Sequence, residues 1–158
     1  MNVAGIILGK TLRKSLVPGA AASILSAISL TVLGKSELNR SSAPVNGPSQ
    51  WVWGRHAPFK NRFSLKYTVL GYAIHHAASV FWATLHEKLQ ERFQAKNWAA
   101  VIAPAVAATA AAYLVDFHVA PKRFSPGFEG RLSKRALFIV YGSFALGLAG
   151  AALLRRRR

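Results

Sequence analysis

Between Lys14 and Lys35 the chain reads SLVPGAAASILSAISLTVLG (residues 15–34), a window of 20 residues without Asp, Glu, Lys or Arg. Three further windows of 19 or 20 residues are equally free of charge and are bounded by charged residues: 67–86, 97–115 and 136–154. A helix needs about 20 largely apolar residues to cross the roughly 30 Å hydrocarbon core of a bilayer. The pattern therefore predicts an all-α, polytopic transmembrane protein whose four spans form an antiparallel four-helix bundle.

The rest of the chain is expected to connect these spans. The expected segments are a basic N-terminal segment (1–14), a first span (15–34), a surface loop (35–66), a second span (65–89), a third span (97–119), a basic loop (120–135), a fourth span (136–154) and an arginine tail (155–158). The first span is longer than the apolar core of a secretory signal, and no clear cleavage site ends it, so we expect it to be retained. The third span is rich in alanine, and its small side-chain volume indicates a helix at the centre of the bundle.

The composition fits a membrane protein with a strongly basic surface. The 158 residues are 52% hydrophobic and carry 21 Lys+Arg against 5 acids, a formal net charge of +16. The basic residues lie between the apolar windows, where they meet lipid phosphates, so the lipid bilayer with its anionic lipids is the expected partner. Nucleic acid is not expected as a partner, because a soluble binder has no use for four apolar windows. The chain has no cysteine, which excludes disulfides, thiolate zinc sites and iron–sulfur ligation.

Tryptophans and arginines mark the expected membrane interfaces. Trp51 and Trp53 lie among basic residues of the long loop, and Trp98 lies at the start of the third span. Aromatic residues beside basic ones are typical of the headgroup level of a bilayer. The tail is expected to bind anionic lipids through four arginines: Arg155, Arg156, Arg157 and Arg158.

The orientation in the membrane stays open. Four spans place both termini on one side, and Lys and Arg are almost equally numerous at the two ends of the spans. The positive-inside rule needs an excess of basic residues on one side, so a dual topology also remains possible. The arginine tail directly follows a span and is hard to translocate, which favours termini inside.

Small residues recur at i, i+4 and i+8 in the first and fourth spans. The two faces consist of Gly19, Ser23 and Ala27 in the first span and Ser143, Gly147 and Ala151 in the fourth. Such faces allow a neighbouring helix to approach closely. They favour a non-enzymatic accessory or structural protein that packs against itself, as a homo-oligomer, or against a larger membrane complex.

The second span is the polar one. It contains His75, His76 and His86 and is followed by Glu87. At 100° per residue, His75 and His86 fall on one stripe, and His76 and Glu87 fall on the adjacent stripe. Ionisable groups in a span usually face the bundle interior and are functional candidates. The alternative interpretation is that neutral histidines only fix the packing of helices through hydrogen bonds.

Asp116 is the most informative acid of the chain. It lies near the end of the third span, at the same membrane side as the start of the second, and His118 follows it. An Asp beside a His provides the elements of a proton relay, although helix positions leave Asp116 several Å shallower than His75 and His76. Pairing of Asp116 with an interfacial basic residue such as Lys122 or Arg123 is the simpler expectation. The relay supports a small transporter or proton-coupled membrane component as the first alternative function.

Haem b is the second alternative, as the cofactor of a redox subunit. Two histidines on facing helices can ligate haem iron, and within one chain the partner of His75 or His76 would be His118. His118 lies much closer to its helix end, so only a symmetric dimer that pairs His76 with its copy avoids a mismatch in depth. No other cofactor or metal site is expected, because the chain has no Glu-x-x-His motif, no Walker loop and no hydrolase motif.

Three segments carry a resemblance to known sequences. They are Pro44–Gly54 (PVNGPSQWVWG), Gly71–Ala83 (GYAIHHAASVFWA) and Val119–Glu129 (VAPKRFSPGFE). They resemble a family of small, uncharacterised bacterial inner-membrane proteins with four predicted spans. The resemblance implies a multi-pass protein of the bacterial inner (cytoplasmic) membrane and implies no activity or functional residue.

Overall fold

The computed structural model describes residues 3–93 and 97–156, with the side chains of 9–93 and 97–155. These residues are helical or irregular and include no strand. The long helices are α1 (Val3–Leu38), α4 (Leu70–Phe93), α5 (Ala99–Leu114) and α6 (Lys134–Arg156). The all-α prediction is therefore confirmed.

Three helical segments are long and apolar enough to cross a membrane: Gly9–Leu38, Ala99–Val119 and Lys134–Arg155. The expectation of helices long and apolar enough to span a membrane is confirmed for these three segments. The helix that contains α4 does not reach the same hydropathy, although residues 67–86 carry no formal charge. Its histidines and hydroxyl side chains, together with the charged residues from Glu87 onward, reduce the apolar character that a charge-free window suggests.

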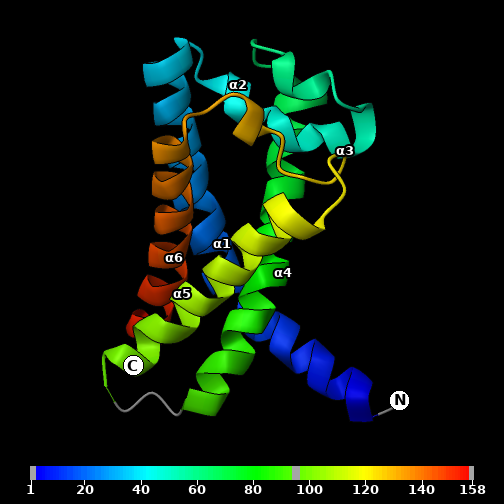
Figure 1. The fold of residues 1–158 in the computed structure, drawn as a ribbon. Coiled ribbons are helices and arrows are strands. Elements are labelled where there is room, and N and C mark those ends of the chain that lie inside the picture. The colour runs from blue at the N-terminus through cyan, green and yellow to red at the C-terminus, as the bar shows by residue number, and fades with distance from the viewer. Residues whose placement is uncertain (1–2, 94–96, 157–158) are drawn as a thin grey trace.

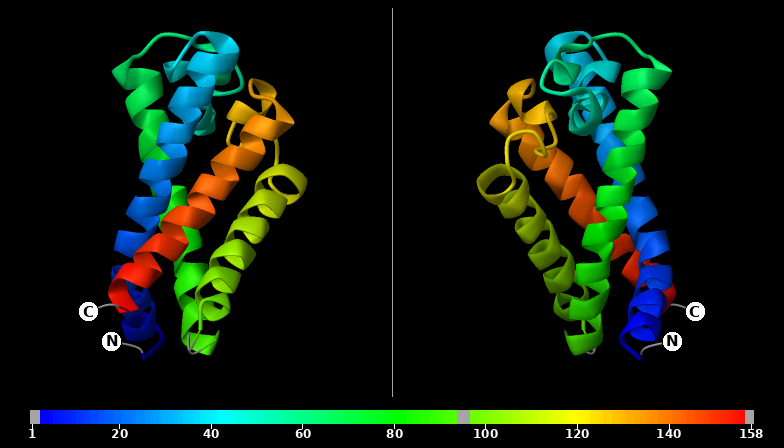
Figure 2. Two further views of the ribbon diagram at one scale, coloured as in Figure 1. Left: turned by 90° about the vertical axis from the view of Figure 1, so that its left-hand side faces the viewer. Right: turned by 90° about the vertical axis from the view of Figure 1, so that its right-hand side faces the viewer.

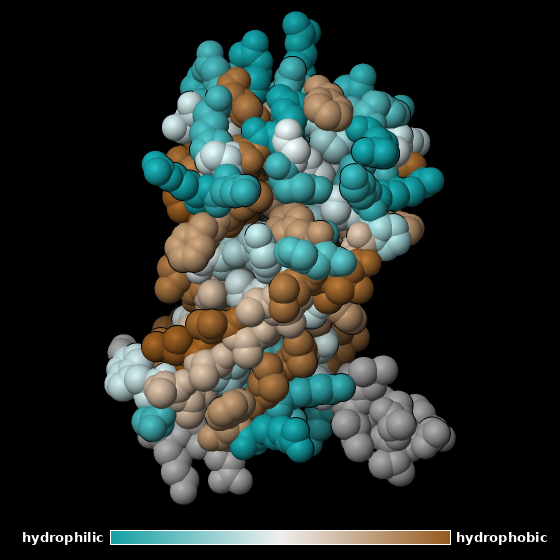
Figure 3. Space-filling model, in the orientation of Figure 1, coloured by the Kyte–Doolittle hydropathy of each residue, from teal (hydrophilic) through white to brown (hydrophobic). Residues whose placement is uncertain are grey.

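The four long helices run between two ends of the molecule. α1 packs against α4 and α6, and α5 packs against the same two helices from the other side. The N- and C-termini lie at one end together with the end of α4 and the start of α5, and the connections 39–64 and 120–133 lie at the opposite end (Figures 1 and 2). Figure 3 shows a hydrophobic band across the middle, between hydrophilic residues at both ends. This distribution is the one that a bilayer requires.

The helices extend beyond the windows predicted from charge. α1 begins at Val3, so it also contains most of the expected basic N-terminal segment, and Pro18 lies in its interior. Proline removes a backbone hydrogen bond inside a helix, and α1 changes direction along its length in Figure 1. Two π-helical turns adjoin the other helices: η3 (Leu65–Val69) precedes α4, and η4 (Val115–Val119) follows α5.

The segment expected as a surface loop folds into a cap over the helix ends. It contains α2 (Ser42–Val45), η1 (Gly47–Ser49), α3 (Gln50–Trp53) and η2 (Ala57–Phe59). The second connection adds η5 (Phe128–Gly130). Residues 43–50 are all buried, so this part of the chain is a packed layer rather than an exposed loop. We call residues 39–64 and 120–133 the cap.

Side-chain amides and two close-packed glycines hold the cap together. The Asn46 amide donates to the Lys60 carbonyl oxygen at 2.7 Å and its side-chain oxygen accepts from Thr68 at 2.6 Å. The Gln50 amide donates to the Ser125 carbonyl oxygen at 2.7 Å, which joins the two connections. Gly47 and Gly127 meet backbone to backbone, and Gly127 has a φ of 82°, so neither position has room for a side chain.

The small-residue faces predicted in the first and fourth spans pack inside the chain. A Cβ at Gly19 would lie 2.7 Å from the Cα of Val80 in α4, and a Cβ at Gly147 would lie 2.5 Å from the backbone nitrogen of Ala22 in α1. Ser23 and Ala151 are buried, Ala27 and Ser143 are partly buried, and the Ser143 hydroxyl lies 2.7 Å from that of Ser29. These contacts place both faces against helices of the same chain, and Gly147 and Ala151 also line a groove between α1 and α6.

The alanine-rich α5 does not lie at the centre of the molecule. Ile102, Val106 and Leu114 on this helix are exposed, whereas α1 has the most extensive contacts, with both α4 and α6. The expectation of a central third helix is therefore wrong. Small side chains allow close approach on one face, and here they face α4 and α6 with Ala105, Ala108 and Ala112 buried.

Candidate functional site

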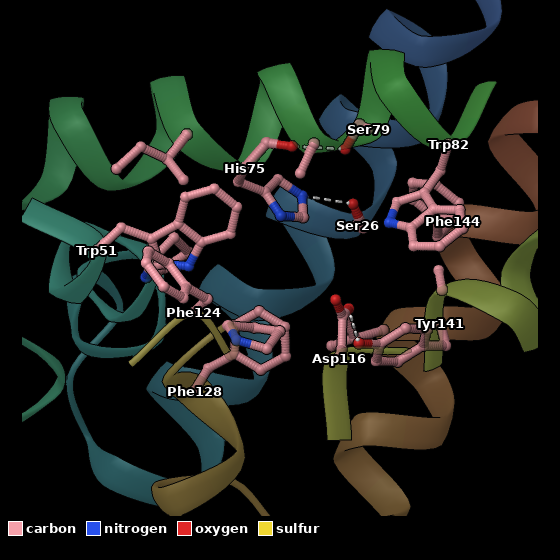
Figure 4. Close-up of a pocket in the computed structure, with 16 residues that line it drawn as sticks. Ser26, Trp51, His75, Ser79, Trp82, Asp116, Phe124, Phe128, Tyr141 and Phe144 are labelled. Carbon is pink, nitrogen blue, oxygen red and sulfur yellow. Dashed lines mark hydrogen bonds between the residues drawn. The ribbon is translucent and has the colours of Figure 1, made fainter. Parts of the chain in front are cut away.

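A partly open cavity of about 60 Å³ lies beneath the cap, between the helices. Its lining comes from every long helix and from both connections, and it combines aromatic rings with a few polar side chains. The labelled lining residues in Figure 4 are Ser26, Trp51, His75, Ser79, Trp82, Asp116, Phe124, Phe128, Tyr141 and Phe144. The volume corresponds to about two water molecules, since one water occupies about 30 Å³ in the liquid.

One wall of the cavity carries His75. Its Nε2 lies 2.8 Å from the Ser26 hydroxyl oxygen, and that hydroxyl lies 2.7 Å from the Ala22 carbonyl oxygen. Because a carbonyl can only accept, Ser26 donates to Ala22 and accepts from Nε2–H of His75. In this arrangement the imidazole proton lies on Nε2, and the Ser23 backbone forms a further hydrogen bond with the ring. Ser79, one turn further along α4, donates to the His75 carbonyl oxygen at 2.7 Å.

The facing wall carries Asp116 and Tyr141. The Tyr141 hydroxyl donates to Oδ2 of Asp116 at 2.6 Å (Figure 4). Asp116 lies in the π-helical turn η4, and π-helical turns occur frequently at functional sites. The expected pairing of Asp116 with a basic interfacial residue is not observed among the described residues, because the hydroxyl of Tyr141 takes that place. Asp116 is expected to lie several Å shallower in the membrane than His75, yet both residues line the same cavity.

The cap provides the roof of the cavity. Trp51 from α3 packs edge-on against Phe124, with ring centroids 5.7 Å apart, and its indole N–H lies 3.3 Å from the Ser125 carbonyl oxygen. Phe128 is buried below them. The sequence predicts Trp51 at the headgroup level, and in the structure its ring also forms part of the cavity wall. Trp53 stays at the surface of the cap, where Lys66 lies 4.5 Å above its ring.

Asp116 connects the cavity to an outer vestibule in the cap. The vestibule has a volume of about 310 Å³, and its polar lining includes Asp116, Glu129, Arg55 and Lys122. Glu129 accepts from the Ser125 hydroxyl through Oε1 at 2.5 Å, while its buried Oε2 has no hydrogen-bond partner among the described residues. A buried carboxylate oxygen without a partner is costly, which makes Glu129 a functional candidate.

The five acids of the chain fall into two groups. Three of them have clear structural partners: Glu37 accepts from the Ser133 backbone and hydroxyl at the start of α6, Glu87 pairs with Arg155, and Glu91 pairs with Lys14. The other two, Asp116 and Glu129, line the vestibule and form no ion pair among the described residues. In so basic a chain, carboxylates that have only hydroxyl partners are conspicuous.

An apolar layer separates the cavity from the termini end. Its buried members are Ala22, Ala83, Ala105, Ala108, Phe144, Leu148 and Ala149, with Trp82 and Leu85 packed against them. Beyond this layer the Arg155 guanidinium donates to both oxygens of Glu87, at 2.9 and 2.5 Å. His86 is fully buried beside them, with Nδ1 3.4 Å from Glu87 Oε1 and no hydrogen-bond partner among the described residues. His86 and Glu87 thus belong to a separate polar cluster.

The remaining predicted residues lie outside the cavity. His76 faces α1, with Nδ1 3.2 Å from the Ser23 hydroxyl, and His118 is exposed in η4. Trp98 is exposed before α5, and the tail residues Arg157 and Arg158 and the side chain of Arg156 lie outside the described residues. Haem does not fit this arrangement within one chain, because His75 and His118 do not share a cavity and the space beside His75 holds only about two waters.

Sequence reasoning missed Ser26, Tyr141 and Glu129. Glu129 was detectable, because it is one of only five acids and lies in a segment that carries the resemblance. Ser26 and Tyr141 carry no such signal, since a serine and a tyrosine are ordinary residues of membrane helices. The segments Pro44–Gly54, Gly71–Ala83 and Val119–Glu129 meet at the cavity, where Trp51, His75 and Phe124 come from one segment each.

Comparison of the chain with protein-family models, with curated proteins and with solved structures gave no match.

Proposed function

We propose that this chain is a proton-coupled membrane transport component, in which Asp116 passes protons between the cap vestibule and His75. The observation that carries the proposal is that Asp116 lines both the vestibule and the cavity. A residue in that position can exchange protons with the aqueous side and with the interior of the molecule. Intramembrane acids and histidines that face a wet cavity are typical of proton relays in pumps and transporters.

The membrane topology is part of the proposal. Three segments are apolar enough to cross the bilayer, and α4 lies between α1 and α5 and runs between the same two ends. We take α4 as the fourth crossing of an antiparallel four-helix membrane bundle, with its polar face turned to the cavity and away from lipid. The resemblance adds the bacterial inner membrane as the proposed location.

The direction of access follows from the two ends of the cavity. On the cap side, Glu129 and Asp116 share the vestibule, so a proton from water reaches Asp116 through carboxylates. From Asp116 a cavity water can carry it to the imidazole of His75, which lines the same cavity. On the termini side, the apolar layer around Phe144 and Leu148 blocks the path. We therefore propose that this conformation gives access from the cap side.

An accessory role through the small-residue faces has less support. Gly19 and Gly147 make their close contacts with Val80 and Ala22 of the same chain. A homo-oligomer or a larger complex would need a surface outside these contacts. No described contact identifies that surface.

The proposal can be tested in proteoliposomes that contain a pH-sensitive dye. With the membrane potential clamped, an imposed pH gradient should collapse faster with the protein than without it. Asp116→Asn should reduce the rate to that of protein-free liposomes, because asparagine does not titrate. Glu91→Gln is the matched control: it removes an exposed acid that pairs with Lys14 away from the path, and it should leave the rate unchanged.

A second pair of variants separates the two adjacent histidines. His75→Gln should abolish the proton flux, whereas His76→Gln should retain it, because His76 contacts Ser23 and does not line the cavity. Equal rates for wild type and Asp116→Asn, or for His75→Gln and wild type, would refute the relay.

A further inference from the structure

A second hollow lies on the opposite side of α6 from α5, between α1 and α6 and toward the termini. It is a groove with a volume of about 640 Å³, within the range of about 300–1,000 Å³ that is usual for ligand sites. Its walls include Val17 and Leu25 of α1 and Leu146 of α6, and Gly150 forms part of the floor. Both helices that form it are apolar enough to cross a membrane. The groove therefore lies between two helices that we place in the bilayer.

The charge of the groove is confined to one end. Arg13, Lys14 and Arg155 line it there, and among the described lining residues there is no Asp or Glu. Lys14 and Arg155 also pair with Glu91 and Glu87, which do not line the groove. Their side chains remain 43% and 39% exposed, so both cations keep donors free to face outward.

The apolar part of the groove has the length of one membrane leaflet. From Lys14 to Leu25 the helix advances about 16 Å at 1.5 Å per residue, and half of a hydrocarbon core is about 15 Å. The cations thus lie where headgroups lie, and the apolar walls lie where acyl chains lie. From this arrangement we infer that the groove binds one anionic glycerophospholipid of the surrounding bilayer, with its phosphate at the three cations and an acyl chain against Gly150. This site is independent of the proposed proton path.

Gly150 allows a steric test. A Cβ at this position has no atom within 4 Å, so a larger side chain would project into the groove without disturbing the helix contact. Gly142 on the same helix has equally open surroundings and lines the hollow between α5 and α6 instead. Gly142→Leu is therefore a matched control for Gly150→Leu, with the same change in the same helix.

The assay is native mass spectrometry of the purified full chain, titrated in mild detergent with phosphatidylglycerol or phosphatidylcholine. We expect one tightly bound phosphatidylglycerol, at least about tenfold preferred over phosphatidylcholine, because each Lys or Arg at the headgroup contributes roughly fivefold. Gly150→Leu should lose this lipid, and Gly142→Leu should retain it. Arg13→Gln should bind about fivefold more weakly, whereas Arg92→Gln, an exposed arginine outside the groove, should bind as the wild type does.

Several outcomes would overturn the inference. Undiminished binding by Gly150→Leu, or equal binding of the two lipids, would show that the groove has no headgroup site. A change in oligomer size on Gly150→Leu would identify a second copy of the chain as the occupant. Arg13→Gln keeps the test decisive if Gly150→Leu does not fold, since Arg13 is exposed at the surface and unchanged binding by this variant would itself contradict the site.

Discussion

Replacing Gly147 with alanine should destabilise the protein, although the same change elsewhere in the helix should stabilise it. Alanine is a better helix former than glycine by about 1 kcal/mol, so Gly→Ala in an unobstructed helix raises the free energy of unfolding by roughly 0.4–1 kcal/mol. At Gly147 the new Cβ would lie 2.5 Å from the Ala22 backbone nitrogen and 2.8 Å from the Ala21 carbonyl carbon. Real Cβ atoms essentially never approach other atoms so closely.

The size of the loss follows from what the Cβ meets. Both atoms belong to the main chain of α1, so no side-chain rotation relieves the overlap and the two helices must separate. Overpacking of this kind typically costs about 1–3 kcal/mol, and here it must exceed the gain of about 1 kcal/mol in helix propensity. For a chain of this size, 1 kcal/mol corresponds to about 2–4 °C in Tm. We expect Gly147→Ala to melt several degrees below the wild type.

The measurement is a thermal melt of purified protein in mild detergent, followed by tryptophan fluorescence or by loss of the monodisperse elution peak. Gly142→Ala is the control, because a Cβ there has no atom within 4 Å. It should melt at or slightly above the wild-type temperature. Opposite signs for these two variants are the expected result. If Gly147→Ala were as stable as Gly142→Ala, the close approach of α1 and α6 described above would be wrong.

Two further predictions concern the topology and the cap. Reporter domains fused before Met1 and after Arg158 should report the same compartment, because both termini lie at one end of the molecule. Opposite compartments would mean that one of the four long helices does not cross the membrane. Asn46→Ala should cost about 1–3 kcal/mol, because it leaves the Lys60 carbonyl and the Thr68 hydroxyl without their partner. Limited proteolysis should then cut within residues 54–64 sooner than in the wild type.

The positions of the long helices could be predicted from charge alone. Charge-free windows correspond to helices here because charged residues avoid the apolar band, and the predicted windows fall inside α1, η3 with α4, and α6. The helix that contains α5 begins within two residues of the predicted start and continues through η4 to Val119. Charge alone does not measure hydropathy, however. By charge alone, the window with His75 and His76 is equivalent to the other three windows. By hydropathy it is the most polar of the four.

The cavity could be predicted only in part. The stripe of His75 and Ser79 follows from helical periodicity, and both residues line the cavity. The partner of Asp116 could not be predicted, because Tyr141 lies 25 residues away on α6 and the pairing depends on how α5 and α6 cross. The cap could not be predicted either. Proline, glycine and asparagine indicate turns locally, but the contact of Gln50 with Ser125 joins residues 75 positions apart.

The way in which the cap is built has a consequence for biogenesis. During synthesis, residues 39–64 leave the ribosome long before residues 120–133, yet Gly47 meets Gly127 and Gln50 requires Ser125 as its acceptor. The first connection therefore cannot reach its final packing until most of the chain has been made. The cap side of the cavity also forms only after residues 120–133 have been made, because Phe124 and Phe128 belong to this later connection. A nascent or truncated chain consequently lacks the cap side of the cavity around His75, and the polar interior is completed as one of the last steps of assembly.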